Sequence, residues 1–124
     1  MKALLLVAHG SRRAQSNDEV RELASKLKQR CGNQYDCVHS AFLELAAPLI
    51  PDGIQQCVEE GASEIVVLPY FLNSGRHVTA DIPKIVSTAE QDYPDVRIEI
   101  ATHLGASEMM IELLIAASNK ATVS

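Results

Sequence analysis

The chain lacks any long hydrophobic run, although 47% of its 124 residues are hydrophobic. A membrane-spanning helix needs about 20 consecutive apolar residues, so we expect a globular protein without a membrane partner. The apolar run Ala3–Ala8 is short for the hydrophobic region of a signal peptide, and His-Gly-Ser-Arg-Arg follows it directly. We therefore interpret the start of the chain as a first β-strand.

Basic residues are also few, with 11 Lys and Arg against 16 Asp and Glu and a net charge of −5. Because phosphate binding usually requires a basic face, we do not expect nucleic acid as a partner. The three cysteines, Cys31, Cys37 and Cys57, are odd in number and form no Cys-x-x-Cys pair. We interpret them as free thiols in a reducing compartment, which predicts a cytoplasmic protein.

Several motifs of cofactor and catalytic sites are missing as well. Neither Gly-x-Gly-x-x-Gly nor the Walker pattern occurs, so we expect no dinucleotide, no nucleoside triphosphate and no organic cofactor. The absence of His-x₃₋₅-His and Cys-x₂-Cys spacings argues against a closed structural zinc site. Ser11 follows His9 closely, but the Gly-x-Ser-x-Gly turn of the hydrolases is absent.

The sequence does contain apolar runs that alternate four times with segments of helical periodicity. The strands are expected at Lys2–Ala8, Asp36–Glu44, Glu64–Tyr70 and Val96–Ala101. Each is followed by an expected helix. The four helices are expected to start at a capping box over Ser16–Glu19, at Pro48, at an Asp81 N-cap with Pro83 in the first turn, and at Ser107. The last helix is expected to bury one stripe of side chains, Met110, Leu113, Leu114 and Ala117.

This alternation predicts one α/β domain over residues 1–124, with a flavodoxin-like, four-stranded parallel sheet and helices on both faces. Right-handed crossovers favour the strand order 2-1-3-4. Ligands of such sheets bind beyond the carboxyl ends of the strands, at the point where the strand order reverses. That point lies between the first and the third strand.

Polar groups follow every expected strand at this edge. His9 follows the first strand, Glu44 ends the second, His77 lies in the loop after the third and His103 follows the fourth. Imidazoles with a nearby carboxylate can bind Co²⁺, Ni²⁺, Fe²⁺ or Zn²⁺, and imidazole can also accept a proton near neutral pH. His9 could instead bond a helix terminus, and Glu44 could be the acidic residue of a helix start. His39, inside a strand, is interpreted as structural.

Cationic side chains stand near the same loops. Arg12, Arg13 and Arg76 could form a positive entrance on an otherwise acidic protein, which would suit an anionic substrate.

Three segments together resemble the sirohydrochlorin chelatases, the class II chelatases of the cobalamin and siroheme pathways. They are His9–Ser11, Ala41–Glu44 with Pro48, and the block Pro-x-Phe-Leu-x-x-Gly-x-His-Val-x-x-Asp-Ile-Pro over Pro69–Pro83. The resemblance extends over roughly residues 2–117 and is to the short, single-domain cobaltochelatase type.

The resemblance implies a metal chelatase (a lyase) that inserts a divalent metal into a sirohydrochlorin-type tetrapyrrole without ATP. Co²⁺ is the expected metal substrate, with Ni²⁺ or Fe²⁺ as alternatives. By resemblance, His9 is the catalytic proton acceptor and a metal ligand, and His77 is the second metal ligand. Expected tetrapyrrole contacts are Glu44, Leu45, Phe71, Leu72, Asn73, Ser74, Gly75 and Arg76, with Ser11, Arg12 and His103 as further candidates.

The short form of the family also implies a homodimer, because many relatives contain two copies of the domain with a cleft between them. Two alternatives remain open at this point. One is a non-catalytic carrier of metal or tetrapyrrole on the same fold, and the other is a small regulatory flavodoxin-like domain.

Overall fold

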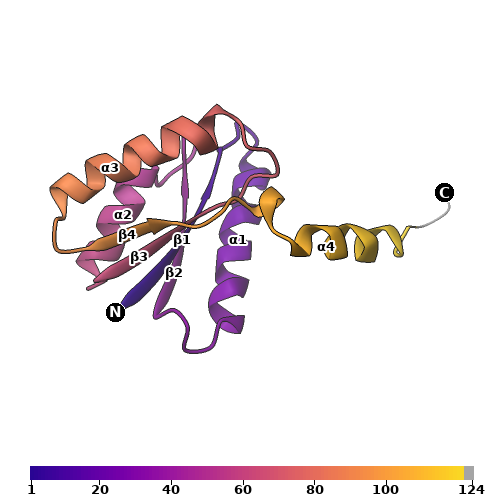
Figure 1. Cartoon of the computed structure of the whole chain (residues 1–124), viewed down its shortest axis with the longest axis horizontal. Helices are drawn as coiled ribbons and strands as arrows, with labels where there is room; N and C mark the ends of the chain where they lie inside the picture. The colour runs from indigo at the N-terminus through magenta and orange to yellow at the C-terminus, as the bar shows by residue number, and fades with distance from the viewer. Residues whose placement is uncertain (122–124) are drawn as a thin grey trace.

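The central feature is a four-stranded parallel sheet in the order β2-β1-β3-β4 (Figure 1). The structure is a computed structural model that describes residues 1–121, except for the side chain of His77. The predicted strand order and parallel pairing are confirmed. The strands are β1 (Lys2–Ala8), β2 (Cys37–Phe42), β3 (Glu64–Pro69) and β4 (Arg97–Ile100).

Four α-helices follow the strands along the chain. They are α1 (Ala14–Arg30), α2 (Ile50–Glu59), α3 (Ile82–Asp92) and α4 (Met109–Ser118), with a π-helical turn at His77–Asp81 and a 3₁₀ turn at Leu104–Ala106. Within residues 1–121, no helix combines the length and the apolar character that a membrane span requires.

The strands differ in how many of their residues are buried. All residues of the run Ala3–Ala8 are buried, because both faces of β1 are covered. The other inner strand, β3, alternates between buried and partly exposed residues. In the outer strand β4, Ile98 is buried, whereas Arg97, Glu99 and Ile100 are exposed. The continuous apolar run at the start of the chain is therefore an inner strand that is covered on both faces.

The helices pack on the two faces of the sheet. Helices α2 and α3 contact each other and cover one face, where the main core lies, and α1 packs against β2 on the other face. Gly53 permits the close approach of α2, because a Cβ atom at this position would lie 2.9 Å from Ala41 Cβ and 3.2 Å from Leu5 Cδ1.

Two predicted helix starts are wrong. Helix α1 begins at Ala14 without a side-chain cap, so Ser16 lies inside the helix and does not begin a capping box. Asp81 precedes α3, but its backbone is already helical (φ −68°, ψ −48°) and its side chain does not cap the helix. The reason is the π-helical turn His77–Asp81, which leads into α3 without a break in helical backbone. Helix α2 begins at Ile50, just after the predicted Pro48.

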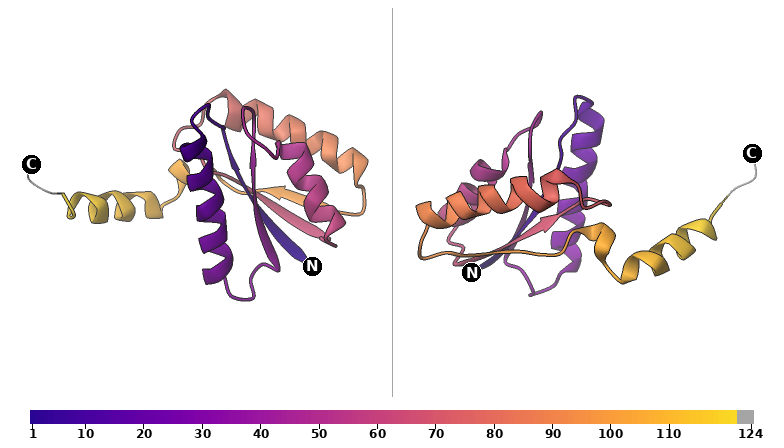
Figure 2. Two further views of the ribbon diagram at one scale, coloured as in Figure 1. Left: turned by 180° about the vertical axis from the view of Figure 1, so that it is seen from behind. Right: turned by 45° about the horizontal axis from the view of Figure 1, so that its top comes forward.

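Helix α4 departs furthest from the prediction. It extends away from the sheet and its three helices in every view (Figures 1 and 2), and none of its residues is buried. The predicted inward stripe, Met110, Leu113, Leu114 and Ala117, does line one side of an apolar hollow. The prediction that this stripe is buried within the same chain is nevertheless wrong, because the hollow is open and α4 makes few contacts with the rest of the chain.

Candidate functional site

His9 and Glu44 meet at the carboxyl edge of the sheet. His9 Nε2 lies 2.9 Å from Glu44 Oε1, and the two side chains are 45% and 59% exposed. The backbone positions them, since Leu43 N–H donates to Ala8 O and Glu44 N–H donates to His9 O. The hydrogen bonding between β1 and β2 thus continues past both strands. It holds the His9 imidazole and the Glu44 carboxylate next to each other at an exposed position.

Gly10 makes this approach possible. Its φ is +95°, a region that other L-residues rarely adopt, and a Cβ atom there would lie 1.7 Å from Glu44 O. Any side chain at this position would push the two loops apart. The Gly after the histidine is therefore required by the geometry of the His9–Glu44 pair.

Asn17 holds the next part of the same loop. Its Oδ1 accepts a hydrogen bond from Ser11 N–H at 2.9 Å, and its Nδ2 donates to Ser11 O at 2.8 Å. It is also the buried polar residue of the described core, with 7% exposure. The sequence pattern predicted that Asn17 belongs to a capping box and did not reveal its role in positioning the His9 loop.

A shallow hollow lies beside Glu44. It has a volume of about 260 Å³ and is lined by Leu43, Glu44, Asp81, Lys84 and Ile85. The end of β2 and the start of α3 thus face each other across it, and Lys84 adds a cation that is not among the predicted site residues. Leu45, next to Glu44, has a φ of 68° and is 55% exposed.

The predicted contact loop, residues 71–76, follows β3, the other neighbour of β1. Phe71 packs partly on the core, whereas Leu72 is 66% exposed and residues 73–76 are exposed. Gly105 N–H donates to Phe71 O, and a Cβ atom on Gly105 would lie 1.6 Å from Leu72 O. Gly105 therefore allows the segment after β4 to lie against this loop.

The other predicted residues have different positions. His77 begins the π-helical turn after this loop, but its side chain lies outside the described part of the structure. Arg12 and Arg13 are exposed in the loop before α1, and Arg13 Nη2 donates to Gln15 Oε1. His103 follows β4 at the same edge, but β3 separates that strand from β1.

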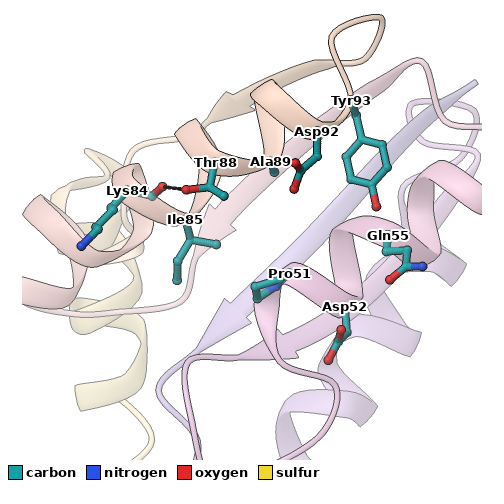
Figure 3. Close-up of a pocket in the computed structure, with 9 residues that line it drawn as sticks. All are labelled: Pro51, Asp52, Gln55, Lys84, Ile85, Thr88, Ala89, Asp92 and Tyr93. Carbon is teal, nitrogen blue, oxygen red and sulfur yellow. Dashed lines mark hydrogen bonds between the residues drawn. The ribbon is translucent and has the colours of Figure 1, made fainter.

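A separate groove lies between α2 and α3 (Figure 3). It has a volume of about 340 Å³ and includes Asp52, Asp92 and Tyr93, while the hydrogen bond drawn there joins Thr88 Oγ1 to Lys84 O within α3. Among the residues that line it, none is a predicted site residue. The candidate site is therefore the edge at His9 and Glu44.

Comparison with known proteins decides the family. The sequence model of CbiX matches residues 3–121. The chain belongs to the CbiX family. The chain is 35% identical over 111 residues to the chloroplastic sirohydrochlorin ferrochelatase of Arabidopsis thaliana, covering 90% of this chain and 48% of that protein. It is 44% identical over 92 residues to the sirohydrochlorin cobaltochelatase of Methanococcus maripaludis, covering 74% and 62%.

The fold agrees with this assignment to the CbiX family. The sirohydrochlorin chelatase SirB of Bacillus subtilis subspecies spizizenii, solved in complex with cobalt, superposes with a TM-score of 0.84 at 30% identity over 95% of this chain. The match covers 50% of the SirB chain, so this chain spans between about half and two thirds of these relatives. The predicted membership in the sirohydrochlorin chelatase family is confirmed, and the relatives include both cobalt and iron enzymes.

Proposed function

We propose that the chain inserts a divalent metal into a sirohydrochlorin-type tetrapyrrole, with Co²⁺ as the favoured metal and Fe²⁺ or Ni²⁺ as alternatives. The observation that carries this proposal is the exposed pair formed by His9 Nε2 and Glu44 Oε1 at 2.9 Å. Family membership supports the reaction class. Both groups are open to solvent at one edge, where a large planar substrate can approach them.

The chemistry of metal insertion requires a base beside a metal ligand. Two pyrrole N–H groups must lose their protons while the metal loses water, and an imidazole can serve both needs. The contact between His9 Nε2 and Glu44 Oε1 places a carboxylate directly beside this imidazole. Glu44 then acts by orienting the ring and by stabilising the imidazolium that forms.

The remaining predicted roles rest on the family resemblance and on position. We propose His77 as the second metal ligand and the loop 71–76 as a wall that contacts the macrocycle. The carboxylates of the substrate would meet the exposed guanidinium groups of Arg12 and Arg76, and Lys84 adds a third cation beside Glu44. The three free thiols are consistent with a reducing cytoplasm.

The test is an anaerobic absorption assay in which sirohydrochlorin is incubated with Co²⁺, Fe²⁺ or Ni²⁺ and the protein. We expect metal-dependent insertion by the wild type and a rate about 100-fold or more lower for His9→Ala, the usual range for loss of a general base. Glu44→Gln should lower the rate less, and Glu90→Gln, an exposed carboxylate on α3, is the matched control. Metal binding without insertion by the wild type would identify a carrier. A His9→Ala rate equal to the wild type would refute the role of His9.

We further propose that the active form is a homodimer joined through α4. Apart from Glu112 and Ser118, every residue of this helix is apolar, and Met109, Ile111, Leu113 and Leu114 are 74%, 65%, 57% and 61% exposed. A helix of this kind is normally buried. The hollow beside it, about 530 Å³, is itself lined by Tyr70, Phe71, Leu72 and Leu104.

A second copy of the chain can cover both the exposed helix α4 and the apolar hollow beside it. In a two-fold dimer the same patch serves both partners, so each exposed α4 can cover the other copy's hollow. Because Phe71 and Leu72 belong to the predicted contact loop, the partner's helix would also form one border of the site.

Light scattering after gel filtration tests this assembly. We expect a dimer at micromolar concentration and a folded monomer for Leu114→Glu, because no residue of α4 is buried in the single chain. Glu112→Gln on the same helix is the control. A monomeric wild type would contradict the homodimer, and a dimeric Leu114→Glu would exclude α4 as the interface.

A further inference from the structure

A second group of metal-binding side chains lies at the opposite end of the sheet. Cys37 and His39 belong to β2, and Glu60 is the C-cap residue of α2. His39 Nε2 lies 2.9 Å from Glu60 Oε1, and one ligand atom from each of the three residues lies within 4.8 Å of the others. A thiol, an imidazole and a carboxylate thus converge on one point.

The fold explains this convergence. Cys37, His39 and Ala41 point to the same face of β2, because side chains alternate along a strand. Helix α2 crosses this face with the stripe Gly53, Cys57 and Glu60, which follows helical spacing. Gly53 lies against Ala41, so the end of the helix reaches the other end of β2 and places Glu60 beside His39.

The cluster is partly open to solvent. The side chains of His39 and Glu60 are 25% and 38% exposed, and Cys37 is half-buried. The neighbouring Cys57 is fully buried, and burial raises the pKa of its thiol to about 12. Because Cys57 is buried beneath the cluster and outside its ligand group, the fourth position of a tetrahedral ion would be a water molecule from the open side.

We propose that Cys37, His39 and Glu60 form a metal site, separate from the His9–Glu44 edge, for a borderline divalent cation such as Zn²⁺ or Co²⁺. Sulfur, nitrogen and carboxylate oxygen are the ligands these ions accept. Bond lengths of about 2.0–2.3 Å place two ligands of one tetrahedral ion roughly 3.4–3.6 Å apart. The three ligand atoms now lie within 4.8 Å of one another, so metal binding would require only small changes in their separations.

Binding of the ion requires one proton transfer. As the metal–sulfur bond forms, the Cys37 thiol releases its proton to solvent and becomes a thiolate. The thiolate and the Glu60 carboxylate then balance the double positive charge of the ion. No oxidant or other reactant is needed.

The two sites lie far enough apart to be measured separately. Phe42, which pairs with Ala8 next to His9, is five residues along β2 from Cys37, or roughly 16 Å at about 3.3 Å per residue. The His9–Glu44 pair contains no sulfur. An absorption band from thiolate to cobalt therefore reports the cluster alone.

The experiment is a titration of the reduced full-length protein with Co²⁺ in the absence of oxygen and of tetrapyrrole. We expect a thiolate-to-cobalt charge-transfer band that saturates with one ion per chain and disappears on addition of Zn²⁺. Cys37→Ser should abolish the band, and His39→Ala and Glu60→Gln should weaken Co²⁺ binding at this site by about 100-fold or more. The band should be unchanged in His9→Ala.

Cys31→Ser is the matched control, because Cys31 is another half-buried free thiol. It should keep the full band. Absence of the band in the wild type would overturn the proposal, and so would its persistence in Cys37→Ser or its equal loss in Cys31→Ser. Circular dichroism of each variant separates loss of a ligand from loss of the fold.

Discussion

The two groups of metal-binding side chains are held by different parts of the fold. His9 and Glu44 stand on loops that follow β1 and β2, and a glycine with positive φ brings these loops together. Cys37 and His39 lie within β2, and Glu60 is fixed by the packing of a whole helix. One site is thus built from turns and the other from regular structure.

This difference suits different tasks. A site on loops presents its groups outward, as the exposure of His9 and Glu44 shows, and can receive a large planar molecule from solvent. A site between a strand and a helix has little room, so it suits a bare ion. The stability of each site should accordingly depend on different residues, which the following substitutions separate.

The largest effect is expected for Gly10→Ala. The new Cβ would lie 1.7 Å from Glu44 O and the backbone would keep an unfavourable φ, so we expect a loss of about 4 kcal/mol or more in unfolding free energy. The remaining folded protein should lose metal insertion but keep the cobalt–thiolate band. Urea unfolding, the insertion assay and Co²⁺ titration measure these three outcomes.

The control for this change is Gly32→Ala. Gly32 also has a positive φ (+61°), but a Cβ there would meet nothing within 4 Å. It should cost only about 1–2 kcal/mol, the price of the backbone conformation alone. Equal losses in the two variants would show that the close approach of Gly10 to Glu44 does not hold the site.

For Gly53→Val we expect a smaller loss of stability, with the functional loss at the Cys37–His39–Glu60 cluster and not at the His9–Glu44 pair. The side chain would crowd Ala41 and Leu5 and push α2 away from β2, at a cost of about 2–3 kcal/mol. Because Glu60 moves with the helix, Co²⁺ binding at the cluster should weaken, whereas metal insertion should change little in the folded fraction. The measurements are urea unfolding, Co²⁺ titration and the insertion assay.

Gly53→Ala provides a graded comparison for the same position, since it adds only the first carbon and should show a weaker form of both effects. A destabilised Gly53→Val protein with unchanged Co²⁺ affinity would contradict the view that helix packing positions Glu60.

The sheet and the His9–Glu44 pair could be predicted because local patterns determine them. Apolar runs and helical spacing identify β1 to β4, and right-handed crossovers limit the strand order. Parallel strands end at one edge, so residues that follow β1 and β2 must approach each other. This reasoning placed His9 near Glu44 although 35 positions separate them in the sequence.

Other features depend on tertiary contacts that no local pattern shows. The Cys37–His39 spacing suits ligands on a strand, but its third member is 21 positions from His39, at the end of α2. The stripe on α4 has the spacing of a buried helix, yet the body of the same chain does not cover it. Spacing predicts which side chains share a face, whereas the surface that covers them depends on the whole fold or on another copy.

Asn17→Ala should have the smallest effect of the three substitutions. It removes two hydrogen bonds to the Ser11 backbone, so we expect a loss of about 1–2 kcal/mol in unfolding free energy and a several-fold lower insertion rate from a looser His9 loop. The stability and insertion rate of Asn17→Asp should lie between those of the wild type and of Asn17→Ala. This variant keeps the acceptor for Ser11 N–H and loses the donor to Ser11 O. Gln15→Ala, which removes an exposed contact with Arg13, should change stability by no more than about 0.5 kcal/mol. If Asn17→Ala weakened the cobalt–thiolate band as much as it slowed insertion, the two sites would not be held independently.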